Sequence, residues 1–305
     1  MKEEKYYRHY RRGLNKIIPE IFVPVSKPKI LDHVYDLNEQ RIGIVGGIFL
    51  KKSNIYKEEL IERLVMGIES IKLEDTHSLI LEELYLFNKD DIEFIENRTG
   101  LQVIEGIDVI VAFLGRVLED IYRILEDDLR NKEVLIIGNY GDLTQNIIKA
   151  ICTKVRFVTL IGDYNNDIED LIIEVLEKTG LSIFYSKSIE KILPNYSIII
   201  NLDENPDIDI SKIRKQVIMF DLSTKGAMNK LMMNGKGPKA IEDFIFQLNQ
   251  ENIKENQWIE DLMPSYVYEY FYPTESAKLK KICVGGNLYN IEDFTDYYVK
   301  DRGKL

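Results

Sequence analysis

The segment Val134–Leu143, with the sequence VLIIGNYGDL, constrains the fold of this chain more than any other. The apolar run Glu133–Ile137 is typical of a central parallel strand that is covered on both faces. Gly138 and Gly141 then turn the chain into an amphipathic helix. A strand, a glycine turn and a helix in this order predict one unit of a parallel α/β sheet. In such a unit the backbone of the turn can approach a phosphate group.

The pattern of apolar strands and helices continues downstream of this segment. Helices between the strands predict right-handed crossovers and therefore a parallel sheet. The further strands are expected at Val155–Ile161, Leu181–Tyr185, Tyr196–Leu202 and Gln216–Leu222, with helices at Asp167–Thr179 and Ile189–Leu193.

The flanking regions predict a mixed α/β cap and a helical C-terminal segment. A helix over Glu58–Ile71, capped by Asn54, carries apolar residues at spacings of three and four. The remaining expected elements are a strand or strand pair at Arg41–Lys51, an ambiguous segment at Ser78–Phe87, a helix from Asn88 to Gly100, a short strand at Leu101–Glu105, a helix from Asp108 to about Asp127 and an apolar helix at Ala240–Leu248.

These elements predict a two-domain α/β fold. Residues 1–110 form an N-terminal cap or substrate domain, and residues 111–240 form the parallel-sheet domain. Residues 241–305 are expected to return and pack on the cap. The basic, tyrosine-rich residues 1–16 fit either a solvated first helix or an arm that docks on a partner.

Composition excludes several classes of protein. The 305 residues carry a formal charge of −11, from 51 acidic and 40 basic side chains, whereas phosphate neutralisation by a nucleic-acid-binding protein favours the opposite balance. Two cysteines and three histidines leave too few ligands for an ordinary zinc site, and no metal is expected. Two cysteines also give no disulfide framework, which favours the cytoplasm. The sequence contains no run of 18 apolar residues, so no membrane span is predicted.

The glycine turn is the predicted cofactor site. Asp163 follows Gly138 by 25 residues, at the end of the second strand, where a carboxylate can accept both ribose hydroxyls of adenosine. A carboxylate there repels a 2′-phosphate, so NAD is preferred over NADP. A domain that keeps this fold and binds nothing is the alternative. The candidate cofactor-binding residues are Gly138, Asn139, Tyr140, Gly141, Asp142, Asp163 and Asn201.

Candidates for catalysis are weak. Asn201, at the end of the fourth strand, either positions a nicotinamide ring or satisfies loop backbone, and Asp221 has the same ambiguity. Asp108 is either a general base or a helix N-cap. Cys283 follows two lysines that could lower its pKa, yet a cysteine in an apolar strand is commonly structural.

The order of these segments resembles that of acyl-[acyl-carrier-protein] reductases, a fatty-aldehyde-forming family with a Rossmann-type build related to shikimate dehydrogenase. GGIFL at Gly46–Leu50 is similar to the opening of the family's N-terminal domain, and Thr99–Ala112 includes Gly106 where the family has a turn before the interdomain helix. VLIIGNYGDLTQ is similar to the cofactor loop, which carries over Gly138, Gly141 and Asp142. KILPNYSIIIN resembles the approach to the fourth strand, and MPSYVYEYF at Met263–Phe271 resembles the Pro-Ser segment before the catalytic helix.

The chain also departs from this family. The family's nucleophilic cysteine follows the Pro-Ser pair, and Tyr266–Phe271 contains no cysteine. The family's basic residue after the second strand, which suits NADPH, is Asp163 here. The resemblance therefore implies the scaffold without the thioester chemistry.

Two functions follow from these observations. The first is an NAD-dependent oxidoreductase that acts on a small or carrier-bound carbonyl in an interdomain cleft. The second is a catalytically silent relative that binds a nucleotide or a protein partner as a scaffold or regulatory subunit. The expected partners are a small-molecule or carrier-bound substrate, with no nucleic acid, and a homodimer is allowed for.

Overall fold

The computed structural model describes residues 27–48, 56–82, 84–139, 141–162, 168–186, 193–224, 226–232, 238–247, 253–271 and 278–300. The chain divides into two compact units. The first comprises Met1–Leu81, Lys89–Val103 and Leu248–Asp261, and the second comprises Glu82–Asn88, Ile104–Gln247 and Leu262–Leu305. Each unit is described by itself.

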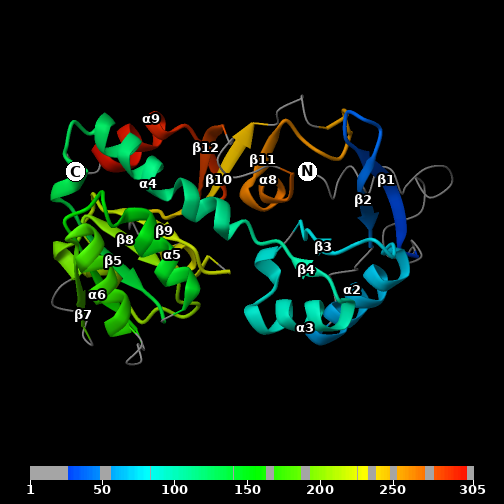
Figure 1. The fold of residues 1–305 in the computed structure, drawn as a ribbon, viewed down its shortest axis with the longest axis horizontal. Coiled ribbons are helices and arrows are strands. Elements are labelled where there is room, and N and C mark those ends of the chain that lie inside the picture. Colours follow the sequence, from blue (N-terminus) through cyan, green and yellow to red (C-terminus); the bar gives the residue numbers. More distant parts are fainter. Residues whose placement is uncertain are drawn as a thin grey trace. The chain divides into compact units, whose positions relative to one another are not determined.

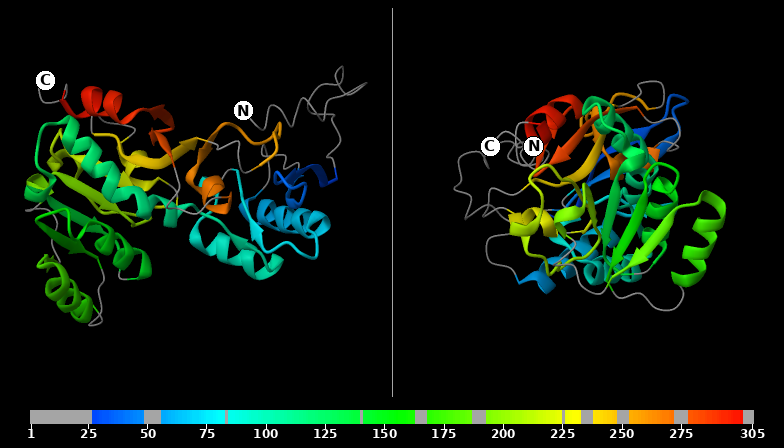
Figure 2. Two further views of the ribbon diagram at one scale, coloured as in Figure 1. Left: turned by 45° about the horizontal axis from the view of Figure 1, so that its top comes forward. Right: turned by 90° about the vertical axis from the view of Figure 1, so that its left-hand side faces the viewer.

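The described residues of the first unit form two small sheets and two helices. Strands β1 (Lys29–Tyr35) and β2 (Arg41–Gly47) form an antiparallel hairpin, and β3 (Ser78–Leu79) pairs in parallel with β4 (Gln102–Val103). Helices α2 (Lys57–Ile71) and α3 (Lys89–Thr99) lie side by side (Figures 1 and 2). The segment Ser78–Phe87, which the sequence left ambiguous between strand and helix, begins with the strand β3.

The predicted cap of α2 is wrong, because the residue before this helix is Tyr56, in an extended conformation and without a side-chain cap hydrogen bond. Asn54 lies outside the described residues. A later segment also joins this unit, since Ile253 bridges Asp36 and the Asn256 side chain donates to the carbonyl oxygen of His33 at 3.2 Å.

The second unit is built on one long sheet, drawn in Figure 1 with its helices around it. Its strands follow the order β13-β12-β10-β9-β8-β5-β6-β7, and β11 pairs with β10. Neighbouring strands from β7 to β10 are parallel, whereas β11, β12 and β13 run antiparallel to their partners. The strands are β5 (Glu133–Ile137), β6 (Phe157–Ile161), β7 (Ser182–Tyr185), β8 (Ile198–Asn201), β9 (Ile218–Asp221), β10 (Ile241–Gln247), β11 (Leu262–Pro264), β12 (Leu279–Val284) and β13 (Asn287–Tyr289).

The parallel strands of this sheet have the Rossmann order. Numbered from β5 to β10 along the chain, they lie as 3-2-1-4-5-6, the arrangement in which strand order reverses between the first and fourth strands. This reversal lies between β5 and β8, where Ile137 is opposite Asn201. The predicted α/β fold with a Rossmann-type parallel sheet is confirmed.

The central strands of the sheet are largely apolar and buried. All residues of β8 and β9 are buried, as are Val134–Ile137 of β5. Helix α4 contacts α5, α8 and α9, and its course past them can be followed in Figure 1. The helices are α4 (Ile107–Ile124), α5 (Asp142–Ile151), α6 (Ile168–Thr179), α7 (Ala227–Met232), α8 (Ser265–Phe271) and α9 (Ile291–Phe294), and a π-helical turn follows at Thr295–Lys300.

The helix predicted at Ala240–Leu248 is wrong, because this segment forms the strand β10. Ile241 pairs with Phe220 of β9, and Phe244 pairs with Ile282 of β12. Both faces of the strand are buried, so its apolar residues are consecutive, and a consecutive apolar run does not distinguish a buried strand from a buried helix. The segment expected to return to the cap also divides: Leu262–Leu305 belongs to the second unit and Leu248–Asp261 to the first.

Within the ranges that the structure describes, none of the helices combines the length and the apolar character that crossing a membrane requires.

Candidate functional site

Two glycines at the carboxyl ends of β5 and β6 are required by packing. The amide of Gly138 donates to the carbonyl oxygen of Ile161 at 2.9 Å, which brings the two strand ends together. Gly162 has φ +151°, and a Cβ there would lie 1.8 Å from the carbonyl oxygen of Gly138. Gly138 has φ +149°, and its Cβ would lie 2.8 Å from Cβ of Leu202. No side chain fits at either position, so the fold itself explains both glycines.

Gly141 differs from these two glycines, because the fold does not require it. It precedes α5 with φ 175° and ψ 178°, an extended conformation that any residue adopts. Among the described residues, other than its chain neighbours, no atom lies within 4 Å of a Cβ built on it. A side chain at this position would meet none of the described residues beyond its chain neighbours.

The turn between Gly138 and Gly141 is held from within by Thr144. Its hydroxyl donates to the carbonyl oxygen of Asn139 at 2.8 Å, and its side chain is buried. Thr144 stands where the third glycine of the dinucleotide fingerprint is expected. The sequence shows this departure, and the structure shows that the hydroxyl fixes the turn.

Helix α5 begins at this turn and presents its N-terminus there. The first amides of an α-helix have no partner within the helix and carry partial positive charge, so they suit a phosphate. The exposed Asp142 adds a carboxylate to the same helical turn. Gly138, Asn139, Gly141 and Asp142 lie in the turn and at the start of α5, whereas Tyr140 and Asp163 lie outside the described residues.

Asn201 and Asp221 lie in a buried hydrogen-bond network at the same edge of the sheet. The Asn201 amide donates to the carboxylate of Asp221 at 3.0 Å and to the carbonyl oxygen of Asp203 at 2.9 Å. Asp221 also accepts from the Ser223 hydroxyl at 2.6 Å and from the Met228 amide at 2.7 Å. Both side chains form hydrogen bonds with protein groups, which supports the structural interpretation of each.

The predicted N-cap role of Asp108 is wrong, because the residue before α4 is Gly106, with φ +82°. The start of α4 is instead held by Glu269 of α8, whose carboxylate accepts a hydrogen bond from the Val109 amide at 3.3 Å. Burial, together with the nearby Asp108 charge, raises the pKa of Glu269. Sequence reasoning missed Glu269, because the two partners are 160 residues apart and neither carries a recognisable motif.

Gly106 connects this helix start to a second distant segment. A Cβ on Gly106 would lie 2.1 Å from the Ser265 hydroxyl and 2.4 Å from the Tyr266 amide nitrogen. The buried Ser265 also donates its amide to Asp243 of β10 at 3.3 Å. Gly106 and the Met263–Phe271 segment, which the sequence singled out separately, therefore pack against each other.

Cys283 does not have the environment of a nucleophile. It lies on β12, where burial and the carboxylates of Glu242 and Asp243 raise the pKa of its thiol to about 12. The two lysines before it in the sequence do not offset these effects. Nucleophilic chemistry needs a thiolate, so this environment favours the structural interpretation of Cys283.

Comparisons with known proteins give no family. No family model matches the sequence, and no curated protein matches it. The chain is similar to a pyrroline-2-carboxylate reductase from Thermococcus litoralis in complex with NADH and L-proline, at 16% identity over 38% of this chain and 36% of that one, with a TM-score of 0.30. It is similar to L-tryptophan dehydrogenase from Nostoc punctiforme at 15% identity over 62% and 54%, with a TM-score of 0.33.

A third solved structure is shikimate 5-dehydrogenase from Listeria monocytogenes in complex with shikimate and NAD. It is 14% identical over 56% of this chain and 67% of that one, with a TM-score of 0.28. The chain thus spans between about a third and two thirds of these proteins. The strand order, rather than these likenesses, defines its fold.

Proposed function

We propose that the second unit binds a nicotinamide dinucleotide and that the protein is an oxidoreductase acting on a small or carrier-bound carbonyl, with NAD preferred over NADP. The observation that carries the proposal is Gly141. It is a glycine at the N-terminus of α5 that neither backbone conformation nor packing against described residues requires.

The position of this glycine in the sheet supports the same function. It follows β5, the strand beside the reversal of strand order, and ligands of open α/β sheets bind in the crevice outside the carboxyl ends at such a point. The backbone of Gly138–Gly141 and the first amides of α5 would hold the pyrophosphate, with Thr144 keeping the turn in place. A bound nicotinamide supplies hydride chemistry, and the residues of this chain bind and orient it.

A catalytically silent nucleotide-binding protein is the second candidate, and the described residues contain an observation that favours it. Asn201 and Asp221 form a hydrogen bond with each other, and Asp221 also accepts from an amide of α7. Burial and neighbouring carboxylates raise the pKa of the Cys283 thiol, which favours its protonated form. Among the described residues at this edge of the sheet, none of the predicted candidates has the contacts of a proton carrier. Binding and catalysis must therefore be tested separately.

The binding test is isothermal titration of the full chain with NADH and with NADPH. We expect heat with NADH, and at least tenfold weaker binding by Gly141→Ala, because its methyl group would occupy the space that the pyrophosphate needs. The melting temperature of this variant should stay unchanged, since the fold has room for the methyl group. Asn146→Ala, at an exposed position on the same helix, is the matched control and should bind like the parent protein.

Three outcomes would decide the proposal. Absence of heat with both dinucleotides removes the cofactor site and the oxidoreductase with it. Unaltered NADH binding by Gly141→Ala contradicts the placement of the pyrophosphate. NADH binding without reduction of any carbonyl in a substrate screen supports the silent alternative. Asp163→Arg tests the NAD preference, because an unchanged preference would contradict the role predicted for its carboxylate.

A further inference from the structure

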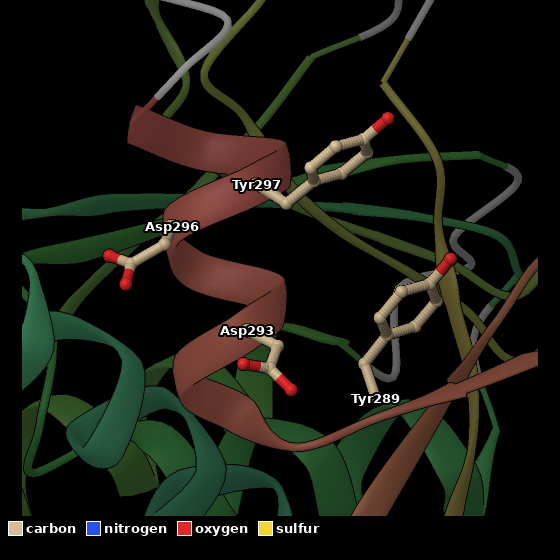
Figure 3. Close-up of a pocket in the computed structure, with 4 residues that line it drawn as sticks. All are labelled: Tyr289, Asp293, Asp296 and Tyr297. Atoms are coloured by element: carbon tan, nitrogen blue, oxygen red, sulfur yellow. The ribbon is translucent and has the colours of Figure 1, made fainter.

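A pocket in the second unit is walled by aromatic rings and carboxylates, and no part of the dinucleotide proposal uses it. Its volume is about 430 Å³, and the described residues that line it are Tyr289, Asp293, Asp296 and Tyr297. Figure 3 shows these side chains on β13 and on the helical segment that follows it.

The walls of this pocket are fixed by the elements that carry them. Tyr289 ends β13 and pairs with Ile282 of β12, so its backbone belongs to the sheet. On the helical segment Phe294 and Val299 are buried and hold one side against the protein. The opposite side presents Asp293 and Tyr297, and the Tyr297 side chain is 65% exposed. Tyr297 and the two carboxylates are therefore exposed on a supported framework, and Tyr289 is half-buried beside them.

The two carboxylates differ in direction and in partners. The Asp296 side chain points to the other side of the helix from the two rings, and it forms an ion pair with Lys300 at 2.9 Å (Figure 3). Asp293 lies between the helix and Tyr289, on the side of the rings (Figure 3). Lys300 thus neutralises Asp296, and Asp293 supplies the negative charge of the pocket itself.

We propose that this pocket binds an organic monocation, an alkylammonium or guanidinium group, between Tyr289 and Tyr297 with Asp293 as its counter-charge. Aromatic faces attract cations through their quadrupole, and a neighbouring carboxylate adds a direct charge interaction. The formal charge of −11 on the chain attracts cations further. An anion would be repelled by Asp293, and a neutral molecule would lack the charge interactions with the ring faces and the carboxylate.

The test is a titration of the full chain, labelled with ¹⁵N, followed by amide chemical shifts. The probes are tetramethylammonium for the two rings and the carboxylate alone and butylguanidinium for a free guanidinium, with N-acetyl-arginine amide representing a protein side chain. tert-Butanol is the neutral control of similar shape, and sodium chloride is matched throughout. We expect saturable shifts confined to residues 287–300 with the organic cations and none with tert-butanol.

Paired variants of equal charge identify the residues. Asp293→Asn should weaken binding of the probes about tenfold, and Asp296→Asn, which removes the same charge on the other side of the helix, should leave it within twofold. Tyr297→Leu should weaken binding about two- to fivefold, the loss expected for one exposed cation–π contact. All three positions are exposed, so each variant should fold, which its melting temperature checks.

The proposal is overturned if tert-butanol shifts the same amides as tetramethylammonium, or if Asp296→Asn weakens binding as much as Asp293→Asn. Absence of saturable shifts also overturns it. Tighter binding of N-acetyl-arginine amide than of butylguanidinium would identify the occupant as a basic side chain of another protein, and the reverse order would identify a free small guanidinium compound. None of these outcomes depends on whether the β5–α5 turn binds a dinucleotide.

Discussion

At the scale of single residues, Gly106 is a position with little conformational freedom. Its φ of +82° suits glycine, and a Cβ would meet both the Ser265 hydroxyl and the Tyr266 backbone. Gly106→Ala should lower the free energy of unfolding by about 2–5 kcal/mol, from backbone strain and from displacement of α8. Urea denaturation measures the loss.

Gly100→Ala separates the two causes. Gly100 has φ +68°, but no atom of the described residues lies within 4 Å of its would-be Cβ. The control should therefore lose only the strain, about 1 kcal/mol. Equal losses for the two variants would show that the contact of Gly106 with Ser265 and Tyr266 contributes nothing.

Asp243 makes stability depend on pH, because burial raises its pKa to about 6 from the usual 3.8. Between these two values the folded protein holds a proton that the unfolded chain has released, so stability falls as the pH rises from 4 to 6. The full cost above pH 6 is at most about 3 kcal/mol.

Asp243→Asn should remove this dependence, since an amide keeps an acceptor for the Phe244 and Ser265 amides and carries no charge. Unfolding free energies of both proteins at pH 4.5 and pH 7.5 test the prediction. The difference between the proteins should grow at the higher pH in favour of the variant. A constant difference would show that the Asp243 pKa is not raised.

At the scale of elements, α7 depends on a carboxylate from the strand before it. Asp221 accepts from the amides of Met228 and Asn229, at 2.7 and 3.3 Å, and is buried. Asp221→Ala should cost about 2–3 kcal/mol, because it leaves buried donors unpaired at the start of the helix. The rate of amide hydrogen exchange at residues 227–232 should be higher in this variant.

The control for this prediction is Asp209→Ala. Asp209 accepts from the Ser211 amide at 3.1 Å at the start of a short helical turn, but it is exposed, so water replaces the lost contact. Its loss should stay below about 1 kcal/mol. A similar cost for both variants would mean that burial of the Asp221 network adds nothing to stability.

Sequence patterns predicted the central elements better than the peripheral ones. β5, α5, β6 and α6 lie within a few residues of their predicted bounds, because each is a full apolar strand or an amphipathic helix with a glycine near its end. β10 was mistaken for a helix, since consecutive apolar residues suit either structure when both faces are buried. Pairing with β9 and β12 makes this segment a strand, and a local sequence pattern does not show which strands will pair.

The same limit applies to the candidate site. The turn at Gly138–Asp142 could be predicted, because strand, glycine and helix are neighbours in sequence. Glu269 and Asp243 could not, because their positions depend on contacts between segments that are far apart along the chain. The different reasons for Gly138 and Gly141 also became visible only when their surroundings were known.

At the scale of the whole molecule, ligand binding and folding should be linked. A ligand that binds only the folded protein stabilises it by about 2.7 kcal/mol at a hundred times its dissociation constant. NADH at this concentration should therefore raise the melting temperature of the parent protein, and tenfold weaker binding by Gly141→Ala should reduce the stabilisation to about 1.4 kcal/mol and the rise to about half. Hydrogen exchange should slow in residues 133–162, and unchanged exchange there would contradict binding at the turn.

The facing glycines at 138 and 162 also bear on how such a protein could change during evolution. A lineage that stopped using a nucleotide would still have to keep both, because a side chain at 162 would collide with the Gly138 carbonyl and one at 138 would collide with Leu202. Position 141 carries no such obligation and would be free to drift. Among orthologues, variation at 141 alongside invariance at 138 and 162 would therefore distinguish descendants that kept only the architecture from those that still use the ligand.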